Sequence, residues 1–184
     1  MSKVKIKNSR QKIANILLSI GCVNINFKNK FILTSGKKSP VYVDCRKLVS
    51  FPKEREIIIN EMSKQIKDIY KGEIIVAGGE TAGIPYSSFI SQKLKLPMVY
   101  IRKQPKGFGK GKLIEGEFRK KSKSILIEDM ATDGGSKIHF INSMRKAHLS
   151  VKDIFVVFFY DIYPSANELS LIHISEPTRL GMIS

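Results

Sequence analysis

Residues 124–136 read Ser-Ile-Leu-Ile-Glu-Asp-Met-Ala-Thr-Asp-Gly-Gly-Ser, and this stretch decides the predicted fold. Its Ile-Leu-Ile run is typical of a buried parallel strand. Glu128 and Asp129 follow where that strand is predicted to end. The small residues up to Ser136 can present backbone N–H groups at the start of a helix, which is a favourable seat for a phosphate. Carboxylates beside a phosphate seat indicate a ligand with both hydroxyls and phosphate, such as a phosphorylated sugar.

The order of an apolar run, an acidic pair and Thr-x-Gly-Gly-Ser resembles the phosphoribosyl pyrophosphate (PRPP) signature of the type I phosphoribosyltransferases. The stretch matches neither the nucleotide motif Gly-x-x-x-x-Gly-Lys-Ser/Thr nor the dinucleotide motif Gly-x-Gly-x-x-Gly. An ordinary strand–turn–helix, in which the acidic pair only caps the helix, is the alternative. The resemblance implies that PRPP is bound by Glu128, Asp129, Met130, Ala131, Thr132, Asp133, Gly134, Gly135 and Ser136.

The same resemblance implies an α/β fold, with a mostly parallel twisted sheet flanked by helices and a small N-terminal hood. The apolar patterns agree with it, because they predict helices at 9–20 with Ser9 as its cap, from Pro52, and around 89–94, and strands at 74–77, 98–101 and 154–159. Two glycine-rich turns, 78–85 and 132–136, follow predicted strands. Ligands of doubly wound sheets bind at that edge, and in the family the first of these turns contacts the pyrophosphate.

Residues 31–46 predict a hairpin, because two short β-like runs flank a Ser-Gly-Lys-Lys-Ser-Pro turn. The pattern Phe-x-Leu-x-Ser-Gly-x-x-Ser-Pro-x-Tyr-x-Asp-x-Arg resembles the hood of the orotate phosphoribosyltransferases, whereas other type I members carry different hoods. The resemblance therefore places a hood at about residues 25–48 and implies orotate as the base. It implies that Tyr42 packs near the base and that Thr132 also binds orotate.

Residues 102–119 contain four glycines and several cations without apolar periodicity, which predicts a mobile surface loop. A solvated connector is the alternative to a lid over a polyanion. Arg-Lys-x-x-Lys-x-x-Gly followed by Ile-Glu-Gly resembles the catalytic loop of the orotate phosphoribosyltransferases. The resemblance implies that Arg102, Lys103 and Lys106 bind pyrophosphate oxygens, and that Lys103 and Lys106 are catalytic together with Asp129. Phe108 stands where many members have histidine.

The chain departs from the family pattern at two further positions. Ile162 stands where many members have an arginine that holds the orotate carboxylate, and Ala82 stands where others have a PRPP-contacting lysine. Likeness ends near Leu171. We therefore expect residues 1–170 to form a single phosphoribosyltransferase domain on a C-terminally truncated chain, and 171–184 to be a non-native tail, such as translated adapter sequence.

The composition is that of a globular protein, with 42% hydrophobic and 26% charged residues. The net charge of +16 invites a nucleic-acid interpretation, but the lysines are scattered, and abundant Lys, Ile and Asn are typical of an AT-rich genome. No apolar run approaches the ~20 residues that span a bilayer. The two cysteines are too few for a disulfide scaffold, and the N-terminus lacks an apolar signal core, so we expect a cytoplasmic protein.

The resemblance covers about residues 10–170 through four motifs in the family's order. It implies an enzyme of pyrimidine biosynthesis that transfers the phosphoribosyl group of PRPP to orotate, giving orotidine 5′-monophosphate and pyrophosphate. It also implies Mg²⁺ carried by PRPP without direct protein ligands, and a homodimer with shared active sites. Another type I phosphoribosyltransferase of purine salvage, or a non-catalytic regulator of PRPP fold that binds RNA, is the alternative.

Overall fold

The computed structural model describes residues 3–33, 36–105, 112–131, 135–160 and 171–175, with residues 3–9 and 171–175 described as backbone only. The described residues form a six-stranded sheet in the order β10-β9-β8-β5-β6-β7. Its strands are β10 (Leu171–Ser175), β9 (Ser150–Phe159), β8 (Lys123–Ala131), β5 (Ile75–Gly79), β6 (Met98–Ile101) and β7 (Ile114–Glu115). Every neighbouring pair is parallel except β6 and β7. The predicted mostly parallel sheet is confirmed.

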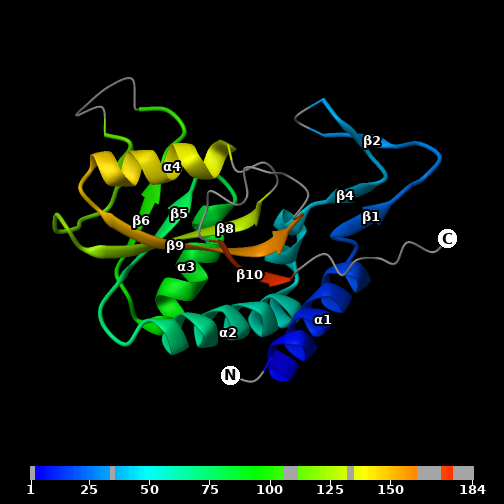
Figure 1. The fold of residues 1–184 in the computed structure, drawn as a ribbon, viewed down its shortest axis with the longest axis horizontal. Coiled ribbons are helices and arrows are strands. Elements are labelled where there is room, and N and C mark those ends of the chain that lie inside the picture. Colours follow the sequence, from blue (N-terminus) through cyan, green and yellow to red (C-terminus); the bar gives the residue numbers. More distant parts are fainter. Residues whose placement is uncertain (1–2, 34–35, 106–111, 132–134, 161–170, 176–184) are drawn as a thin grey trace.

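Helices cover both faces of the sheet (Figure 1), as expected for strands buried on both sides. Helix α4 (Gly135–Lys146) lies on one face, and α2 (Pro52–Ile69) and α3 (Gly83–Leu94) lie on the other with α1 (Lys3–Ser19) beside them. Alternate residues of β8 divide between two apolar clusters. Ile125 and Ile127 pack with the α1–α2–α3 side, whereas Leu126 packs with the α4 side.

The hood consists of two short antiparallel pairs, which stand at one end of the sheet in Figure 1. A hairpin is present, but its predicted pairing is wrong, because β2 (Phe31–Ile32) pairs with β3 (Lys38–Ser39), which lies inside the predicted turn. The next strand, β4 (Val41–Val43), pairs with β1 (Val23–Ile25) and leads into a 3₁₀ helix, η1 (Cys45–Ser50).

Two long-range hydrogen bonds attach the hood to the main body of the fold. The hydroxyl of Tyr160 accepts a bond from the N–H of Val43 at 3.1 Å. The Tyr86 hydroxyl donates to the carbonyl of Cys45 at 2.6 Å. Both tyrosines are buried, so the hood is fixed at the points where it meets the sheet and α3.

Several predicted boundaries are confirmed, namely the start of α2 at Pro52 and the bounds of β6. The predicted cap at Ser9 is wrong, because α1 begins at Lys3 and Ser9 lies inside it. The prediction that the strand ends at the acidic pair is also wrong. Strand β8 continues to Ala131, because its last residues keep pairing with β9 as far as Phe159.

The predicted mobile loop at 102–119 contains one short strand in its second half, β7, while its mobility stays a prediction. The N–H of Arg102 donates to the carbonyl of Leu113 at 2.8 Å. Ile114, the first residue of β7, then pairs with Ile101 at the end of β6. Ile114 is buried in the same apolar cluster as Val99 and Ile101 of β6. Residues 106–111 lie outside the described part of the chain.

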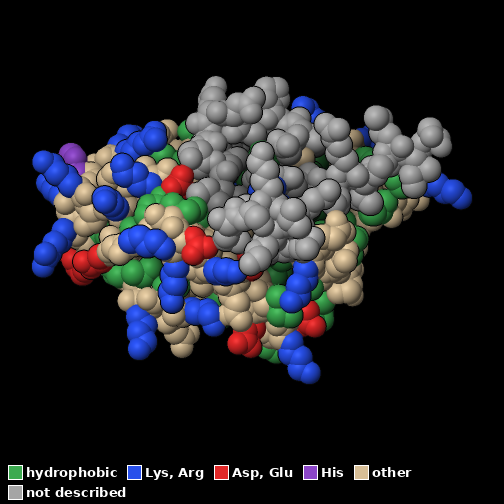
Figure 2. Space-filling view, turned by 60° about the horizontal axis from the view of Figure 1, so that its bottom comes forward, with side chains coloured by type: hydrophobic (Ala, Val, Ile, Leu, Met, Phe, Trp, Pro, Cys, Tyr) green, Lys and Arg blue, Asp and Glu red, His purple; other side chains and the backbone are tan. Residues whose placement is uncertain are grey.

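The expected tail begins with a strand, because Leu171 pairs in parallel with Ile154 and β10 extends the sheet at the β9 edge. That 171–184 is non-native stays a prediction. Figure 2 shows Lys and Arg side chains dispersed over the visible face, with acidic side chains among them, rather than gathered in one stripe. Among the described residues, no helix combines the length and apolar character needed to cross a membrane.

Gly78 sets how closely β5 and α3 approach, and this predicts a stability effect. A Cβ atom at Gly78 would lie 2.6 Å from the carbonyl oxygen of Gly83, a backbone atom that cannot swing away. Gly78→Ala should therefore lower the free energy of unfolding in urea by about 1–3 kcal/mol or more. Gly72→Ala is the control, because a Cβ there would meet nothing within 4 Å, and its effect should stay within about 0.5 kcal/mol. Equal effects of the two substitutions would contradict this account.

Candidate active site

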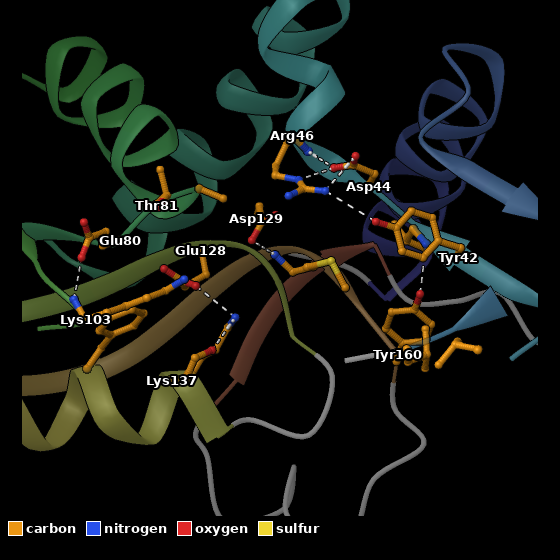
Figure 3. Close-up of a pocket in the computed structure, with 17 residues that line it drawn as sticks. Tyr42, Asp44, Arg46, Glu80, Thr81, Lys103, Glu128, Asp129, Lys137 and Tyr160 are labelled. Carbon is orange, nitrogen blue, oxygen red and sulfur yellow. Dashed lines mark hydrogen bonds and ion pairs between the residues drawn. The ribbon is translucent and has the colours of Figure 1, made fainter. Parts of the chain in front are cut away.

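A cavity of about 500 Å³ lies at the carboxyl ends of β5 and β8, between the hood and α4 (Figure 3). This is the sheet edge where ligands of doubly wound folds bind. Six of the predicted site residues line it, namely Tyr42, Lys103, Glu128, Asp129, Met130 and Ser136. The predicted convergence of the hood and the acidic pair on one site is therefore present.

The other predicted residues do not line the cavity or lie outside the description. Ala131 is buried, and its carbonyl accepts the N–H of Tyr160 at 3.1 Å. Gly135 is the first residue of α4. The Arg102 guanidinium donates to the carbonyl of Gln104 at 3.3 Å and is not among the residues that line the cavity. The positions outside the described residues are Lys106, Phe108, Thr132, Asp133, Gly134 and Ile162.

The acidic pair is split between the two faces of the sheet, because successive side chains of a strand point to opposite sides. Glu128 is oriented like Leu126, toward α4, and its carboxylate meets Lys137 there. Asp129 is oriented like Ile127, toward the hood side. Burial is the main cause of the raised pKa of Cys45 and of Tyr86, both of which belong to the hood-side cluster, and the charge of Asp129 adds to the rise of each.

Both carboxylate oxygens of Glu128 have partners within the protein. Oε1 accepts the N–H of Gly79 at 3.0 Å, and Oε2 lies 3.0 Å from the ammonium nitrogen of Lys137. Burial raises the pKa of Glu128 above its ordinary value, while Lys137 and the Gly79 N–H oppose that rise. Glu128 therefore ties the end of β5 to the first turn of α4.

Glycines of the first glycine-rich turn make room for this carboxylate. A Cβ atom on Gly83 would lie 2.6 Å from the carbonyl oxygen of Ile127, and one on Gly79 would collide with Glu128 and with Phe140. The predicted turn at 78–85 thus serves packing at these positions. Its cavity-lining residues are Glu80, Thr81 and Ala82.

Asp129 presents a carboxylate at the floor of the cavity. It is 7% exposed, and its Oδ1 accepts the N–H of Met130 at 2.8 Å. Burial raises the pKa of Asp129, and the nearby positive charge of Lys137 opposes the rise. No described lysine or arginine forms an ion pair with it. Of the acidic pair, Asp129 is therefore the residue placed to meet a ligand.

Several polar residues that line the cavity were not among the predicted site residues, namely Asp44, Arg46, Glu80, Thr81, Lys137 and Tyr160. The Arg46 guanidinium donates to both carboxylate oxygens of Asp44, at 2.6 and 3.0 Å, and lies 3.5 Å from the Tyr42 hydroxyl. Hydrogen bonds from Arg46 lower the pKa of Asp44. Arg46 ends the Asp-x-Arg part of the hood motif, which was the available signal for it. Glu80 and Thr81 lie in the glycine-rich turn 78–85, whose predicted contact with pyrophosphate was the signal for them, whereas Lys137 and Tyr160 became visible only through tertiary contacts.

Glu80 fixes the start of the predicted catalytic loop, because its Oε2 accepts the N–H of Lys103 at 2.7 Å. Figure 3 shows this contact on the side of the cavity opposite Tyr42. The cavity thus carries cationic groups from the hood, from the loop after β6 and from α4, around buried carboxylates. Such an arrangement suits a ligand that combines phosphates, hydroxyls and a polar ring.

Relatives by sequence indicate one family, although no protein-family model matches the sequence. The chain is 41% identical to orotate phosphoribosyltransferase of Ruegeria sp. over 84% of this chain and 70% of the relative. It is 39% identical to that of Roseobacter denitrificans over 88% and 73%. In structure it is similar to orotate phosphoribosyltransferase from Aeropyrum pernix, with a TM-score of 0.78, 23% identity and coverage of 90% and 93%.

The raised pKa of Glu128 predicts a pH-dependent stability term. Between the ordinary value of 4.5 and the higher folded value, the folded chain holds a proton that the unfolded chain has lost. The wild-type free energy of unfolding should therefore fall relative to that of Glu128→Gln as the pH rises through this window, and the difference should then level off. Urea unfolding from about pH 4 to about pH 8 measures it. Glu117→Gln removes an exposed carboxylate and is the matched control. A wild-type free energy of unfolding that rises relative to that of Glu128→Gln as the pH increases would refute the assignment.

Proposed function

The chain belongs to the orotate phosphoribosyltransferase family, and we propose that it transfers the phosphoribosyl group of PRPP to orotate in the cavity between the hood and the sheet. One observation carries the proposal: a buried carboxylate, Asp129, lies at the floor of the cavity that hood residues Tyr42 and Arg46 line from above. The products are orotidine 5′-monophosphate and pyrophosphate, so the enzyme serves pyrimidine biosynthesis. It works in the cytoplasm, where its two buried, unpaired cysteines stay reduced.

Asp129 stabilises the ribose ring in this proposal. Positive charge develops on the ring as pyrophosphate departs, and a fixed carboxylate in a water-poor site stabilises that charge strongly. Asp129 also accepts hydrogen bonds from the ribose hydroxyls. Glu128 contributes through position, because Gly79 and Lys137 already occupy its oxygens.

The 5′-phosphate binds at the turn that opens α4. Ser136 supplies a hydroxyl there, and it belongs to the first turn of a helix, where the positive end of the helix dipole favours an anion. Thr132, Asp133 and Gly134 complete this seat by the family resemblance.

Pyrophosphate binds on the Lys103 side of the cavity. Glu80 holds the Lys103 backbone, which orients the beginning of the loop that also carries Arg102 and Lys106. Their positive charges neutralise the departing pyrophosphate, and closure of the loop keeps water from the activated sugar.

Magnesium enters this proposal as an ion carried by PRPP. The donor set fits, since Glu80 and Asp129 line the cavity with carboxylate oxygens. In the described ranges there is no cluster of three or more His, Cys, Asp or Glu that would build a dedicated metal site. Mg²⁺ typically keeps waters and takes substrate phosphates with few protein ligands, and when bound it neutralises the charge of the pyrophosphate.

Orotate occupies the hood side of the cavity. The Tyr42 ring, which packs at 5.6 Å from the ring of Phe31, provides an aromatic surface for the base. Arg46 supplies a guanidinium cation on a side chain that is 64% exposed. A guanidinium in this place suits the orotate carboxylate and accounts for base selection by the hood.

We further propose a homodimer in which each loop completes the neighbouring site. The Arg102 side chain turns to the Gln104 carbonyl instead of lining its own cavity, whereas Lys103 lines it. Arg102 and Lys106 therefore serve the partner's site, and Lys103 serves its own chain.

The substrate assignment predicts selectivity among bases. With PRPP and Mg²⁺, orotate should be consumed, while uracil, hypoxanthine and adenine should not, because they lack the carboxylate that Arg46 and the hood accommodate. Chromatography of the nucleotide products measures this directly. Faster reaction of hypoxanthine or uracil than of orotate would overturn the orotate assignment and favour another type I activity.

The shared-site proposal predicts complementation between inactive chains. Asp129→Asn should lose roughly 10²–10³ in rate, as removal of one preorganised charge typically does, and Lys106→Ala should be similarly impaired. Mixed and re-equilibrated, the two variants should recover about a quarter of wild-type turnover, because about half of the dimers are mixed and each has one competent site of two.

Lys103→Ala mixed with Asp129→Asn is the matched control. If Lys103 serves its own chain, each site of that mixed dimer carries one defect, and no activity should return. Native mass spectrometry of the mixtures verifies that heterodimers form. Heterodimers of Lys106→Ala and Asp129→Asn that stay inactive would show that the loop acts within its own subunit.

A further inference from the structure

Lys137 is a buried lysine at the edge of the proposed PRPP site. It is 8% exposed and belongs to the first turn of α4. Its ammonium nitrogen lies 3.0 Å from Oε2 of Glu128 and 3.2 Å from the hydroxyl oxygen of Ser136. Lysine is rarely buried, and an ammonium group in such a place needs compensating partners.

The position of Lys137 differs from that of the other cations around the cavity. Among the described residues that line it, the basic side chains are Arg46, Lys103 and Lys137, and of these only Lys137 is buried. Figure 3 shows its side chain extending from α4 toward Glu128, below Asp129, and its ammonium nitrogen also contacts the Ser136 hydroxyl. A ligand that contacts Asp129 and Ser136 together must therefore pass close to this ammonium group.

Position 82 of the same cavity carries no positive charge. Ala82 lines it with a methyl group, where the family resemblance leads one to expect a lysine that contacts PRPP. The binding of a polyanion next to two buried carboxylates requires a nearby cation, since like charges in a poorly solvated site repel strongly. Lys137 is the described cation that faces both carboxylates.

We propose that Lys137 binds PRPP directly and takes over the role of the lysine that Ala82 replaces. This rests on the proposed function of the cavity. An ammonium group has three N–H donors, and its described contacts with Glu128 and Ser136 use two of them. The third donor bonds an anionic oxygen of PRPP, while Glu128 holds the side chain in place before the ligand arrives. A fixed cation of this kind binds without the entropy loss of ordering a flexible lysine.

The competing explanation is that Lys137 only neutralises Glu128. The two explanations separate in a double variant. Lys137→Met keeps most of the length of the side chain but removes its charge, and Glu128→Gln combined with Lys137→Met removes both members of the ion pair. If neutralisation is the whole role, the double variant should bind PRPP as the wild type does.

Calorimetric titration with PRPP and Mg²⁺ provides the test. We expect Lys137→Met to bind PRPP at least about tenfold more weakly, the double variant to bind as weakly as Lys137→Met, and Lys137→Arg to recover part of the loss. Lys146→Met, which removes an exposed lysine from the last turn of the same helix, should bind as the wild type does. Wild-type affinity in the double variant, or in Lys137→Met itself, would overturn the proposal.

Two further measurements keep the outcomes distinct. Circular dichroism and urea unfolding identify any variant that fails to fold. If Lys137→Met fails to fold, the affinity of the double variant Glu128→Gln with Lys137→Met for PRPP decides whether Lys137 binds the ligand. Wild-type turnover with PRPP and orotate tests the proposed function separately. If the wild type neither binds PRPP nor reacts, the function of the cavity is wrong; if it does both and Lys137→Met binds equally well, only the role of Lys137 is wrong.

Discussion

The carboxylate of Glu128 is buried in the middle of the fold, and a buried charge must find partners or be neutralised. Here the partners come from two other elements, the Gly79 N–H at the end of β5 and the Lys137 ammonium group in the first turn of α4. Three segments that are separate in the sequence therefore converge on one side chain. Glycine at positions 79 and 83 follows from the same constraint, because a methyl group would occupy the space that the carboxylate needs.

The two residues of the acidic pair therefore have different structural roles. Adjacent residues of a strand face opposite sides of the sheet, so Glu128 organises the α4 side while Asp129 lies on the side of the hood. Because β8 stays paired with β9 as far as Ala131, both carboxylates are held by a rigid strand rather than by a loop. A charge that must stabilise a short-lived cationic ring benefits from such rigidity, since it then needs no reorganisation during the reaction.

The hood shows how specificity is added to this frame. Its strands are short, and they depend on contacts with the body of the fold, through Tyr160 to Val43 and through Tyr86 to Cys45. These bonds bring Tyr42 and Arg46 over the cavity that the sheet provides. In the proposed function, the phosphoribosyl group lies at the sheet edge, and the hood presents the groups that distinguish one base from another.

The local elements could be read from the sequence, because they depend on local chemistry. The apolar Ile-Leu-Ile run, Pro52 at a helix start and the glycine-rich turns each restrict the backbone where they stand, and the motif spacing located Tyr42, Lys103 and Asp129. The roles of Glu128 and Lys137 were decided only by tertiary structure. Gly79 and Glu128 are 49 residues apart, and Val43 and Tyr160 are 117 apart. No local pattern records such contacts, since they arise when packing brings distant segments together and burial then forces each polar group to find a partner.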